Sequence, residues 1–543
     1  MKKITFALIC FLSSNIQSQE VYKAYKKPKV VKTTTNFLEY LNGINNLIEF
    51  SGGITIYQKG KLQFDYYKGL ESNKSGKKIS SKSRFPLASL TKPFTAMMIL
   101  KLEEEGKIDL EKTISDYLPY YPKKIGGKIK IIHLLNNRSG LPDYTSRYDE
   151  VSASNLSISD FILKFCTENP NFEPGSSYEY SNTGFYILGA IIEKLTGKKF
   201  KDALESEIIQ IADMKNSGVF ERKRLYQEDL VDGHENMINS KPFNPITVYA
   251  AGNAYSTTED MVKWYKAIMD YKILSKETVD DLFSGKPIRY YKGWGYQNIH
   301  GEVGFGHTGG ITGFNTQMIT IPEEDLFIII LANNSTLPLQ KIGKDLIAIS
   351  IGKKIKVPSQ RKSITVPSML LEKFVGAYEH VNGNKLQIGT ENGEISLYLF
   401  GNKRKLKAEA INKFYMDQFG PMIELDFEGN LIWNQDGNKF RYKKVNNNQP
   451  SFDNKISLSE DDILKLTGKY INGNSTIFIS LKSNRLIFKK DSEDEKNLLQ
   501  KKDKSFYYQL NDNGFMFKYP VEFRKSKGSY ELIYDGNIIY SKK

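Results

Sequence analysis

The segment that decides the fold is Arg84-Phe85-Pro86-Leu87-Ala88-Ser89-Leu90-Thr91-Lys92. Ser89 and Lys92 are three positions apart at the start of a predicted helix, so their side chains lie on the same side. A serine hydroxyl is a weak nucleophile until a base takes its proton, and a lysine amine of lowered pKa can act as that base. The helix N-terminus also presents N–H groups to developing negative charge. Alone, the spacing also fits an exposed serine and a solvated lysine.

A second segment, Tyr178-Glu179-Tyr180-Ser181-Asn182, precedes another predicted helix. A phenol near ammonium groups can be held as a phenolate and serve as a base. Asn182 lies two residues after Tyr180, on the same side of an extended segment, where its amide is placed to orient a substrate and the lysine. The alternative interpretation is a packed aromatic ring followed by a turn asparagine.

A third segment, Gly306-His307-Thr308-Gly309-Gly310, comes just before a predicted strand. Glycines let a substrate backbone approach closely and leave N–H groups free. His307 and Thr308 would present polar groups on one wall of a site. The alternative is an ordinary turn at the entry to a strand.

Together, the order, spacing and flanking contexts of the three segments resemble the serine β-lactamase and penicillin-binding-protein superfamily. The likeness is to its class C-like branch, which also contains esterases and D-amino-acid peptidases. Tyr180-Ser181-Asn182 replaces the Ser-Asp-Asn motif, as in the branch with a tyrosine base. The resemblance covers about residues 36–355, and four further segments share it: 133–135, 139–142, 251–257 and 293–296.

The resemblance implies a role for each motif residue. Ser89 becomes the acylated nucleophile, and Lys92 and Tyr180 share the proton relay. Two N–H groups, those of Ser89 and Gly310, form the oxyanion hole. The remaining residues are expected to contact or position the substrate: Asn182, His307, Thr308, Gly309 and Tyr144.

His307 departs from the family pattern, because β-lactamases and carboxypeptidases of the family usually carry lysine there. A neutral histidine supplies less charge to a substrate carboxylate at pH 7. The sequence therefore predicts an exported serine hydrolase acting on a small ester, amide or D-amino-acid peptide. Two alternatives remain: a D-alanyl-D-alanine carboxypeptidase or β-lactamase, and a non-catalytic protein that binds peptidoglycan fragments.

The pattern of the first 355 residues predicts an α/β (α+β) domain with an antiparallel sheet flanked by helices. Apolar residues at helical spacing indicate helices over 94–105 and 185–195, and hairpins are predicted over 53–67 and 316–331. Strands at both ends with helices between them favour a sandwich whose terminal strands share one sheet. The catalytic domain is placed at residues 19–355.

Two small all-β, barrel-like domains are predicted after it, at 370–447 and 461–543, with linkers at 356–369 and 448–460. Short alternating strands meet there at Asn-Gly, Asp-Gly and Glu-Gly turns. A weak repeat favours duplication, because the segments 374–378 and 466–470 share a Gly-x-Tyr core 92 positions apart. An acidic run, residues 491–495, is a candidate for binding a substrate ammonium group, by analogy with family aminopeptidases.

The 543 residues include 77 basic and 62 acidic side chains, for a formal charge of +15. The lysines are scattered rather than clustered with aromatics, so we expect no nucleic-acid partner. Residues 1–18 have the charge and apolar pattern of a signal peptide, which predicts a periplasmic or secreted protein without a stable membrane span. Cys10 and Cys166 and five histidines show no metal-ligand spacing, so no metal or cofactor is expected. The sequence leaves the oligomeric state open.

Overall fold

The protein is described by a computed structural model. It describes residues 36–147, 151, 155–220, 230–235, 238–239, 245–285, 289–381, 385–399, 402–426, 429–435, 438–448, 464–472, 475–482, 485–490, 496–497, 499–500, 506–512, 515–526, 529–534 and 538–542. The predicted signal peptide and the acidic run 491–495 lie outside this part of the chain.

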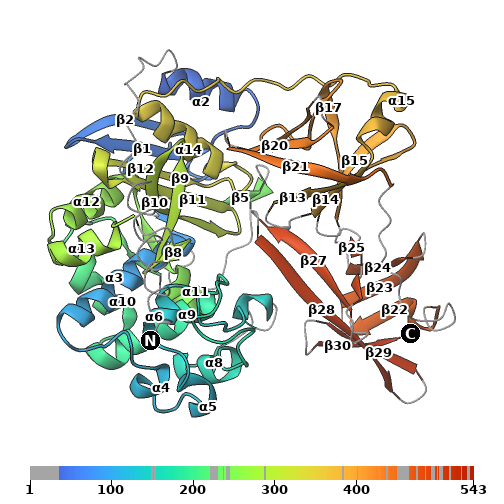
Figure 1. Cartoon of the computed structure of the whole chain (residues 1–543). Helices are drawn as coiled ribbons and strands as arrows, with labels where there is room; N and C mark the ends of the chain where they lie inside the picture. The colour runs from blue at the N-terminus through green and yellow to red at the C-terminus, as the bar shows by residue number, and fades with distance from the viewer. Residues whose placement is uncertain are drawn as a thin grey trace, which may run out of the picture.

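A seven-stranded antiparallel sheet forms the centre of the first domain (Figure 1). Its order is β2-β1-β12-β11-β10-β9-β8. The strands are β1 (Gly52–Gln58), β2 (Lys61–Lys68), β8 (Tyr290–Tyr291), β9 (Trp294–Ile299), β10 (Glu302–Ile311), β11 (Phe314–Ile321) and β12 (Leu326–Ala332). Gly52 lies opposite Ala332 and Gln58 opposite Leu326, so the first strand of the domain pairs with its last. This confirms the predicted sharing of one sheet.

The sheet is buried on both faces, which explains the uninterrupted apolar run of β12. Alternate residues of β12 (Leu326, Ile328 and Ile330) join the core beneath α2 (Phe37–Asn45) and α14 (Leu339–Ser350). The residues between them (Phe327, Ile329 and Leu331) join the larger core on the other face. Because successive side chains of a strand point to opposite faces of the sheet, β12 contributes to two separate cores.

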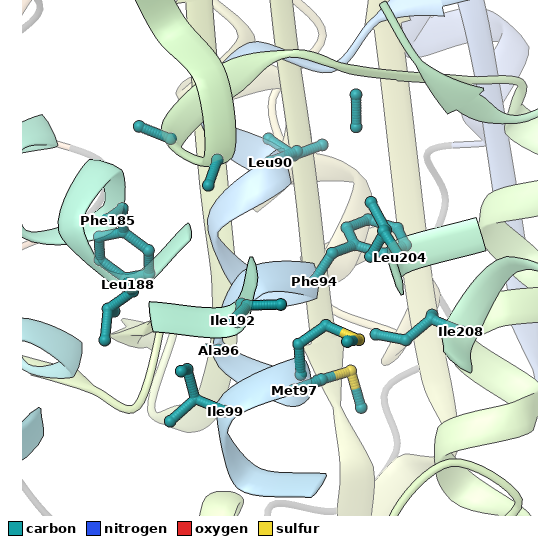
Figure 2. Packing of buried hydrophobic residues seen from close by; sticks show 14 of the residues in the cluster. Leu90, Phe94, Ala96, Met97, Ile99, Phe185, Leu188, Ile192, Leu204 and Ile208 are labelled. Atoms are coloured by element: carbon teal, nitrogen blue, oxygen red, sulfur yellow. The ribbon is translucent and has the colours of Figure 1, made fainter. Parts of the chain in front are cut away.

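The helices of the larger core enclose α3 (Thr91–Glu104), the helix that carries Lys92. Figure 2 shows α3 side chains such as Phe94 and Met97 packed among residues of α9 (Asn182–Thr196) and of the segment that follows it. Nearly all of α3 is buried, and its apolar residues are spread around the helix instead of forming one face, so the helix is not amphipathic. The site described below is therefore attached to a helix that is packed on nearly all sides.

The remaining elements of this domain are short, apart from α12 (Thr258–Met269). The helices are α4 (Ile114–Tyr117), α5 (Lys123–Gly126), α6 (Ile131–Leu135), α8 (Ile158–Phe165), α10 (Phe200–Leu204), α11 (Pro245–Gly252) and α13 (Lys276–Leu282). The small strands are β3 (Phe85–Pro86), β4 (Gly218–Val219), β5 (His234–Glu235), β6 (Ile238–Asn239) and β7 (Ala254–Ser256). β7 lies between β3 and β4.

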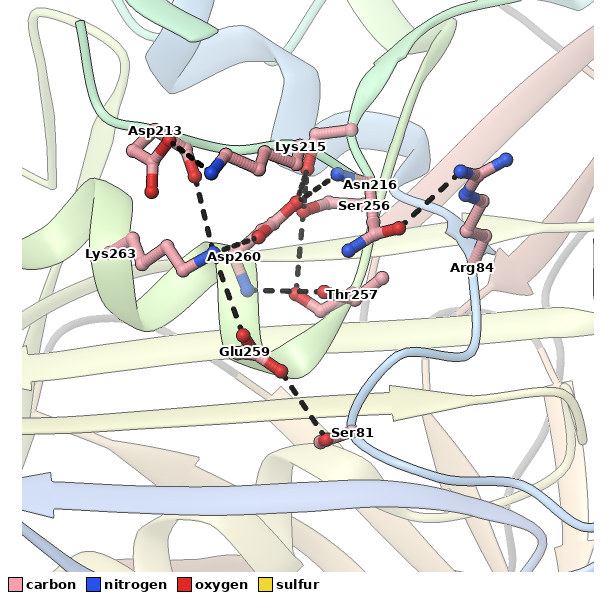
Figure 3. A network of polar contacts seen from close by, with 11 residues as sticks. Ser81, Arg84, Asp213, Lys215, Asn216, Ser256, Thr257, Glu259, Asp260 and Lys263 are labelled. Atoms are coloured by element: carbon pink, nitrogen blue, oxygen red, sulfur yellow. Dashed lines mark hydrogen bonds and ion pairs between the residues drawn. The ribbon is translucent and has the colours of Figure 1, made fainter. Parts of the chain in front are cut away.

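A buried carboxylate ties α12 to the loop before β4 (Figure 3). Asp260 accepts hydrogen bonds from Asn216 N at 2.6 Å, Ser217 Oγ at 2.9 Å and Lys263 Nζ at 3.0 Å. Because Asp260 has no exposed surface, its charge needs these donors. The network holds β7 in place. This strand directly follows α11, which forms part of the site described below.

Two nine-stranded antiparallel sheets follow, and they share one strand order. The first runs β16-β15-β14-β13-β21-β20-β19-β18-β17, and the second runs β25-β24-β23-β22-β30-β29-β28-β27-β26. The strands of the first sheet are β13 (Gly376–His380), β14 (Lys385–Glu391), β15 (Glu394–Leu399), β16 (Asn402–Lys405), β17 (Lys407–Ala410), β18 (Lys413–Tyr415), β19 (Met422–Leu425), β20 (Leu431–Gln435) and β21 (Asn438–Asn446). Those of the second are β22 (Gly468–Asn472), β23 (Ser475–Lys482), β24 (Arg485–Lys490), β25 (Lys496–Asn497), β26 (Leu499–Gln500), β27 (Phe506–Asp512), β28 (Phe515–Ser526), β29 (Ser529–Tyr534) and β30 (Ile538–Lys542).

The repeat found in the sequence corresponds to matching contacts in the two sheets. The Tyr378 hydroxyl donates to the carbonyl four residues before it at 2.8 Å, and the Tyr470 hydroxyl does the same at 2.8 Å. Gly376 and Gly468 both have a positive φ, 145° and 143°, where a side chain would be strained. The glycine and the tyrosine recur in the sequence because each has the same task in its sheet.

The first β sheet curls until its two edge strands meet. Leu406 separates β16 from β17, and its N–H donates to the Ile395 carbonyl of β15 at 2.9 Å. The predicted linker is also held in place, since Ile364 N donates to the Ala408 carbonyl of β17 at 2.8 Å. A short helix, α15 (Ser368–Leu371), then leads into β13.

None of the helices in the described part of the chain is long and apolar enough to cross a membrane. Within the same residues, no cluster of three or more His, Cys, Asp or Glu side chains is arranged to hold a metal ion.

Candidate active site

Ser89 lies in a strained turn at the start of α3. It is the middle residue of a 3₁₀ turn, η1 (Ala88–Leu90), and Ala88 before it has a φ of +48°. That conformation is unusual for a residue with a side chain and requires support from its surroundings. Ser89 remains partly exposed while Ala88 and Leu90 are buried, so the turn presents the hydroxyl outward.

Strand β10 supports this turn directly at Gly309. A β-carbon at Gly309 would lie 2.3 Å from the Leu87 carbonyl oxygen and 2.3 Å from Thr316 Oγ1. The Thr316 hydroxyl donates to the same Leu87 carbonyl at 2.9 Å, which links β11 to the turn. Only glycine at position 309 allows this close contact between the strand and the Ser89 turn.

The Lys92 amine is surrounded by three oxygen atoms. Nζ lies 2.9 Å from Ser89 Oγ, 2.7 Å from Asn182 Oδ1 and 2.9 Å from the Ala251 carbonyl oxygen. The amide and carbonyl oxygens can only accept, so they take two N–H groups of the amine. The remaining position on the nitrogen, a third N–H or a lone pair, points to Ser89.

The environment of Lys92 favours the neutral amine. The side chain has no exposed surface, and this burial lowers the pKa of Lys92 to about 7. The nearby negative charge of Asp143 acts in the opposite direction and keeps the pKa from falling further. About half of the molecules then carry a neutral amine at pH 7, against roughly one in 3,000 for an ordinary lysine.

Tyr180 lies beside Ser89 and Lys92. Lys92 Nζ is 5.0 Å from the centre of its ring, and Ser89 hydrogen-bonds its hydroxyl. Burial raises the pKa of Tyr180 above its usual range, and the Ser89 hydrogen bond offsets this only in part. The structure therefore favours a protonated phenol rather than the expected phenolate, because burial outweighs the hydrogen bond from Ser89 and His307 is neutral.

His307 is held in one neutral form. Its Nδ1 lies 2.6 Å from the Thr308 carbonyl oxygen, which can only accept, so Nδ1 carries the proton. The Tyr290 hydroxyl, 3.0 Å from Nε2, then donates to that nitrogen. Burial, with a smaller contribution from the Lys92 charge, lowers the pKa of His307 to about 3. Both ring nitrogens are thus used within the protein.

The glycine-rich strand supplies the exposed side of the site. The pairing of β9 with β10 ends at Gly306, while β11 stays paired with β10 on the other edge. On the edge that β9 leaves, β10 approaches the Ser89 turn at Gly309. Thr308 is partly exposed, and Gly310 is exposed with no atom within 4 Å of a β-carbon placed there. This leaves room for a substrate next to Ser89, as the predicted oxyanion hole requires.

Tyr144 is the one predicted substrate contact that the structure places elsewhere. Its side chain is only 2% exposed, and its hydroxyl donates to the Thr247 carbonyl at 2.5 Å. The ring packs edge-on against Phe161 and Tyr186. Tyr144 is thus a core residue, and the expectation for it is corrected.

Three residues of the site were missed by the sequence analysis: Asp143, Ala251 and Tyr290. Asp143 Oδ2 accepts from the Asn182 backbone N–H at 3.1 Å and from its side-chain Nδ2 at 2.8 Å. Asp143 directly follows the segment 139–142, and Ala251 begins the segment 251–257. Both segments share the family resemblance noted in the sequence. Tyr290 had no such signal, since its role appears only when β8, β9 and β10 form one sheet.

The comparisons with known proteins agree with this geometry. The family model described as Beta-lactamase matches residues 46–350, more than half of the chain. The chain belongs to the beta-lactamase family. It is a serine hydrolase of that family, in the class C-like branch.

Individual relatives extend the match beyond the first domain. Penicillin-binding protein 4* of Bacillus subtilis (strain 168) is 28% identical over 430 residues, covering 72% of this chain and 94% of that protein. The octameric penicillin-binding protein homologue from Pyrococcus abyssi shares the fold over 79% of this chain and 99% of its own, with a TM-score of 0.53 and 20% identity. The D-stereospecific amidohydrolase from Streptomyces sp. shares it over 58% and 98%, with a TM-score of 0.50 and 22% identity.

Proposed function

We propose that this serine hydrolase cleaves a small ester, amide or D-amino-acid peptide through an acyl-enzyme on Ser89. The observation that carries the proposal is the placement of Lys92. Two fixed acceptors hold its N–H groups, and its remaining position faces the Ser89 hydroxyl at 2.9 Å. A buried amine with a pKa of about 7 in that position is suited to general-base catalysis near neutral pH.

Acylation follows from these positions. The neutral Lys92 amine takes the Ser89 proton while Oγ attacks the substrate carbonyl carbon. The N–H groups of Ser89 and Gly310 then stabilise the oxyanion. When the carbon–leaving group bond breaks, the Tyr180 phenol gives its proton to the leaving group and receives one from the Lys92 ammonium. In deacylation, water replaces the leaving group and the protons move in reverse, which frees Ser89.

The His307–Tyr290 pair supports the substrate class. A cation at position 307 would attract a substrate carboxylate, but the ring is neutral and has no free N–H group. We therefore favour substrates without a carboxylate at this position. The likeness to a D-stereospecific amidohydrolase agrees with that choice, although it concerns the fold alone.

A second candidate is a cell-wall carboxypeptidase or β-lactamase. The match to Penicillin-binding protein 4* over nearly its whole length favours this candidate. A protein that only binds peptidoglycan fragments is disfavoured, because the nucleophile, base and acid are all in place. We also propose export, on the basis of the charged and apolar pattern of residues 1–18.

Two measurements separate these candidates. The first is turnover of p-nitrophenyl acetate and D-alanine p-nitroanilide, and the second is intact mass after incubation with benzylpenicillin, with Ser89→Ala as the control for both. Turnover of the ester or anilide by the native protein alone, without a lasting penicillin adduct, is the expected result. A stable adduct on Ser89 would favour the second candidate, and turnover by Ser89→Ala would refute the Ser89 mechanism.

A further inference from the structure

We propose that Asp143 is a positioning residue of this site, which fixes the orientation of the Asn182 amide and places a compensating negative charge near Lys92. The inference rests on the proposed function, because it concerns the activation of Ser89. Asp143 comes from the loop after Pro142, and Asn182 is the first residue of α9.

The orientation argument depends on what each atom can donate. A carboxylate only accepts, so the Asn182 group that faces Asp143 Oδ2 at 2.8 Å is the NH₂. The amide oxygen must then face Lys92 Nζ, at 2.7 Å. If the amide were reversed, its NH₂ would face the N–H groups of the amine and its oxygen would face the carboxylate. Both contacts would be repulsive, so Asp143 excludes the reversed form.

The amide orientation in turn decides where the amine points. With Asn182 Oδ1 and the Ala251 carbonyl as fixed acceptors, the free position of Nζ is directed at Ser89. Without a fixed amide oxygen, the amine could turn its lone pair away from the hydroxyl. A positional error of about 1 Å in such a group can cost on the order of a hundredfold in rate.

The charge argument concerns the proton on Lys92. The groups that surround the amine are the Ser89 and Tyr180 hydroxyls, the Asn182 amide, the Ala251 carbonyl, the ring of Phe185 at 5.6 Å and neutral His307. Asp143 is the anion among its neighbours and raises the pKa of Lys92 against the effect of burial. Removing the charge should therefore shift the protonation of the amine to lower pH.

Asp143 also closes its own turn, and a test must separate that role. Oδ1 accepts from Thr145 N at 3.0 Å and from Thr145 Oγ1 at 2.9 Å. The chain offers a matched control, because Asp116 Oδ2 accepts from Thr113 N and Oγ1, both at 2.7 Å. Asp116 is an exposed aspartate that caps α4 and is not part of the site.

The experiment measures the rate at which a fluorophosphonate labels Ser89 from pH 5 to 10, by intact mass. In the native protein we expect the rate to rise with a midpoint near pH 7. Asp143→Asn should lower that midpoint by about one unit and keep most of the plateau rate, since its amide oxygen still accepts from Asn182. Asp143→Ala should also lose about tenfold or more of the plateau rate, because nothing then fixes the amide.

The controls determine how each outcome is interpreted. Asp116→Asn and Thr145→Val should keep the native midpoint, and thermal unfolding reports whether each variant is folded. If Asp143→Asn does not fold, Asp143→Ser removes the charge while leaving a hydroxyl for the turn, and we expect the same shift. An unchanged midpoint of the labelling rate in the folded Asp143 variant, or an equal shift in Asp116→Asn, would overturn this inference and leave the proposed function standing. A native protein that no fluorophosphonate labels at any pH would instead overturn the proposed function, and the inference with it.

Discussion

Gly309→Ala tests whether the contact between β10 and the Ser89 turn is essential. The added methyl carbon would lie 2.3 Å from the Leu87 carbonyl oxygen and 2.3 Å from Thr316 Oγ1, and 3.2 Å from the Ala88 β-carbon. Ordinary contact begins near 3.4 Å, so the strand and the turn must separate by about 1 Å. The backbone of Gly309 is not left-handed, and the effect is therefore purely steric.

A displacement of that size moves one side of the oxyanion hole away from the nucleophile. We expect kcat/KM to fall about a hundredfold, equivalent to about 2.7 kcal/mol in the barrier. Overpacking should also lower the free energy of unfolding by about 1–3 kcal/mol. The assays are ester hydrolysis, the rate of fluorophosphonate labelling, and urea unfolding.

Gly310→Ala is the matched variant, because the same methyl group would meet no atom within 4 Å. It should keep the native free energy of unfolding, whereas Gly309→Ala should lose stability. Native activity and stability in Gly309→Ala would refute the reasoning, since the strand would then not be in contact with the turn.

Three other predictions follow from the site and its support. Because the pKa of Lys92 is about 7 and its neutral form is the base, kcat/KM should rise about tenfold per pH unit below 7 and level off above it; a flat profile from pH 5 to 9 would contradict this role. His307→Lys places a cation on β10, so the rate of acylation by benzylpenicillin, measured by intact mass, should increase at least tenfold. An unchanged rate would show that residue 307 does not contact the carboxylate of the penicillin. Asp260→Asn removes the charge from a fully buried hydrogen-bonded group, so the free energy of unfolding measured in urea should fall by about 2–3 kcal/mol. No loss would mean that the network of Figure 3 adds little to stability.

The residues that the sequence predicted best are those whose geometry is local. Ser89 and Lys92 are one helical turn apart, so spacing alone brings them together, and the structure has them 2.9 Å apart. The hairpins of the central sheet were likewise evident from short apolar or alternating runs on either side of tight turns. Such patterns need no knowledge of distant parts of the chain.

The site residues whose roles could not be predicted from the sequence depend on long-range contacts or on the direction in which a loop turns its side chains. Asp143 and Tyr144 are neighbours where a loop runs into a short 3₁₀ turn, so no periodic pattern tells which side chain faces the site, and Tyr144 was predicted in place of Asp143. The protonation of Tyr180 also depends on burial by surrounding elements, which a motif does not reveal. Tyr290 meets His307 only because β8 and β10 belong to one sheet.

The two β units have a consequence for how such chains change in length. Each copy carries its own glycine and its own tyrosine hydrogen bond, and in each a lysine amine donates to a carbonyl just before the glycine, Lys444 to Lys373 and Lys542 to Lys465. The hydrogen bonds that recur in each copy are thus encoded within a stretch of about 92 residues. A tandem copying error that adds such a stretch, or a deletion that removes it, leaves these hydrogen bonds of the neighbouring copy in place. Descendants of one ancestral hydrolase can therefore differ by whole β units, and each surplus copy is free to acquire new surface residues while the enzyme keeps its own.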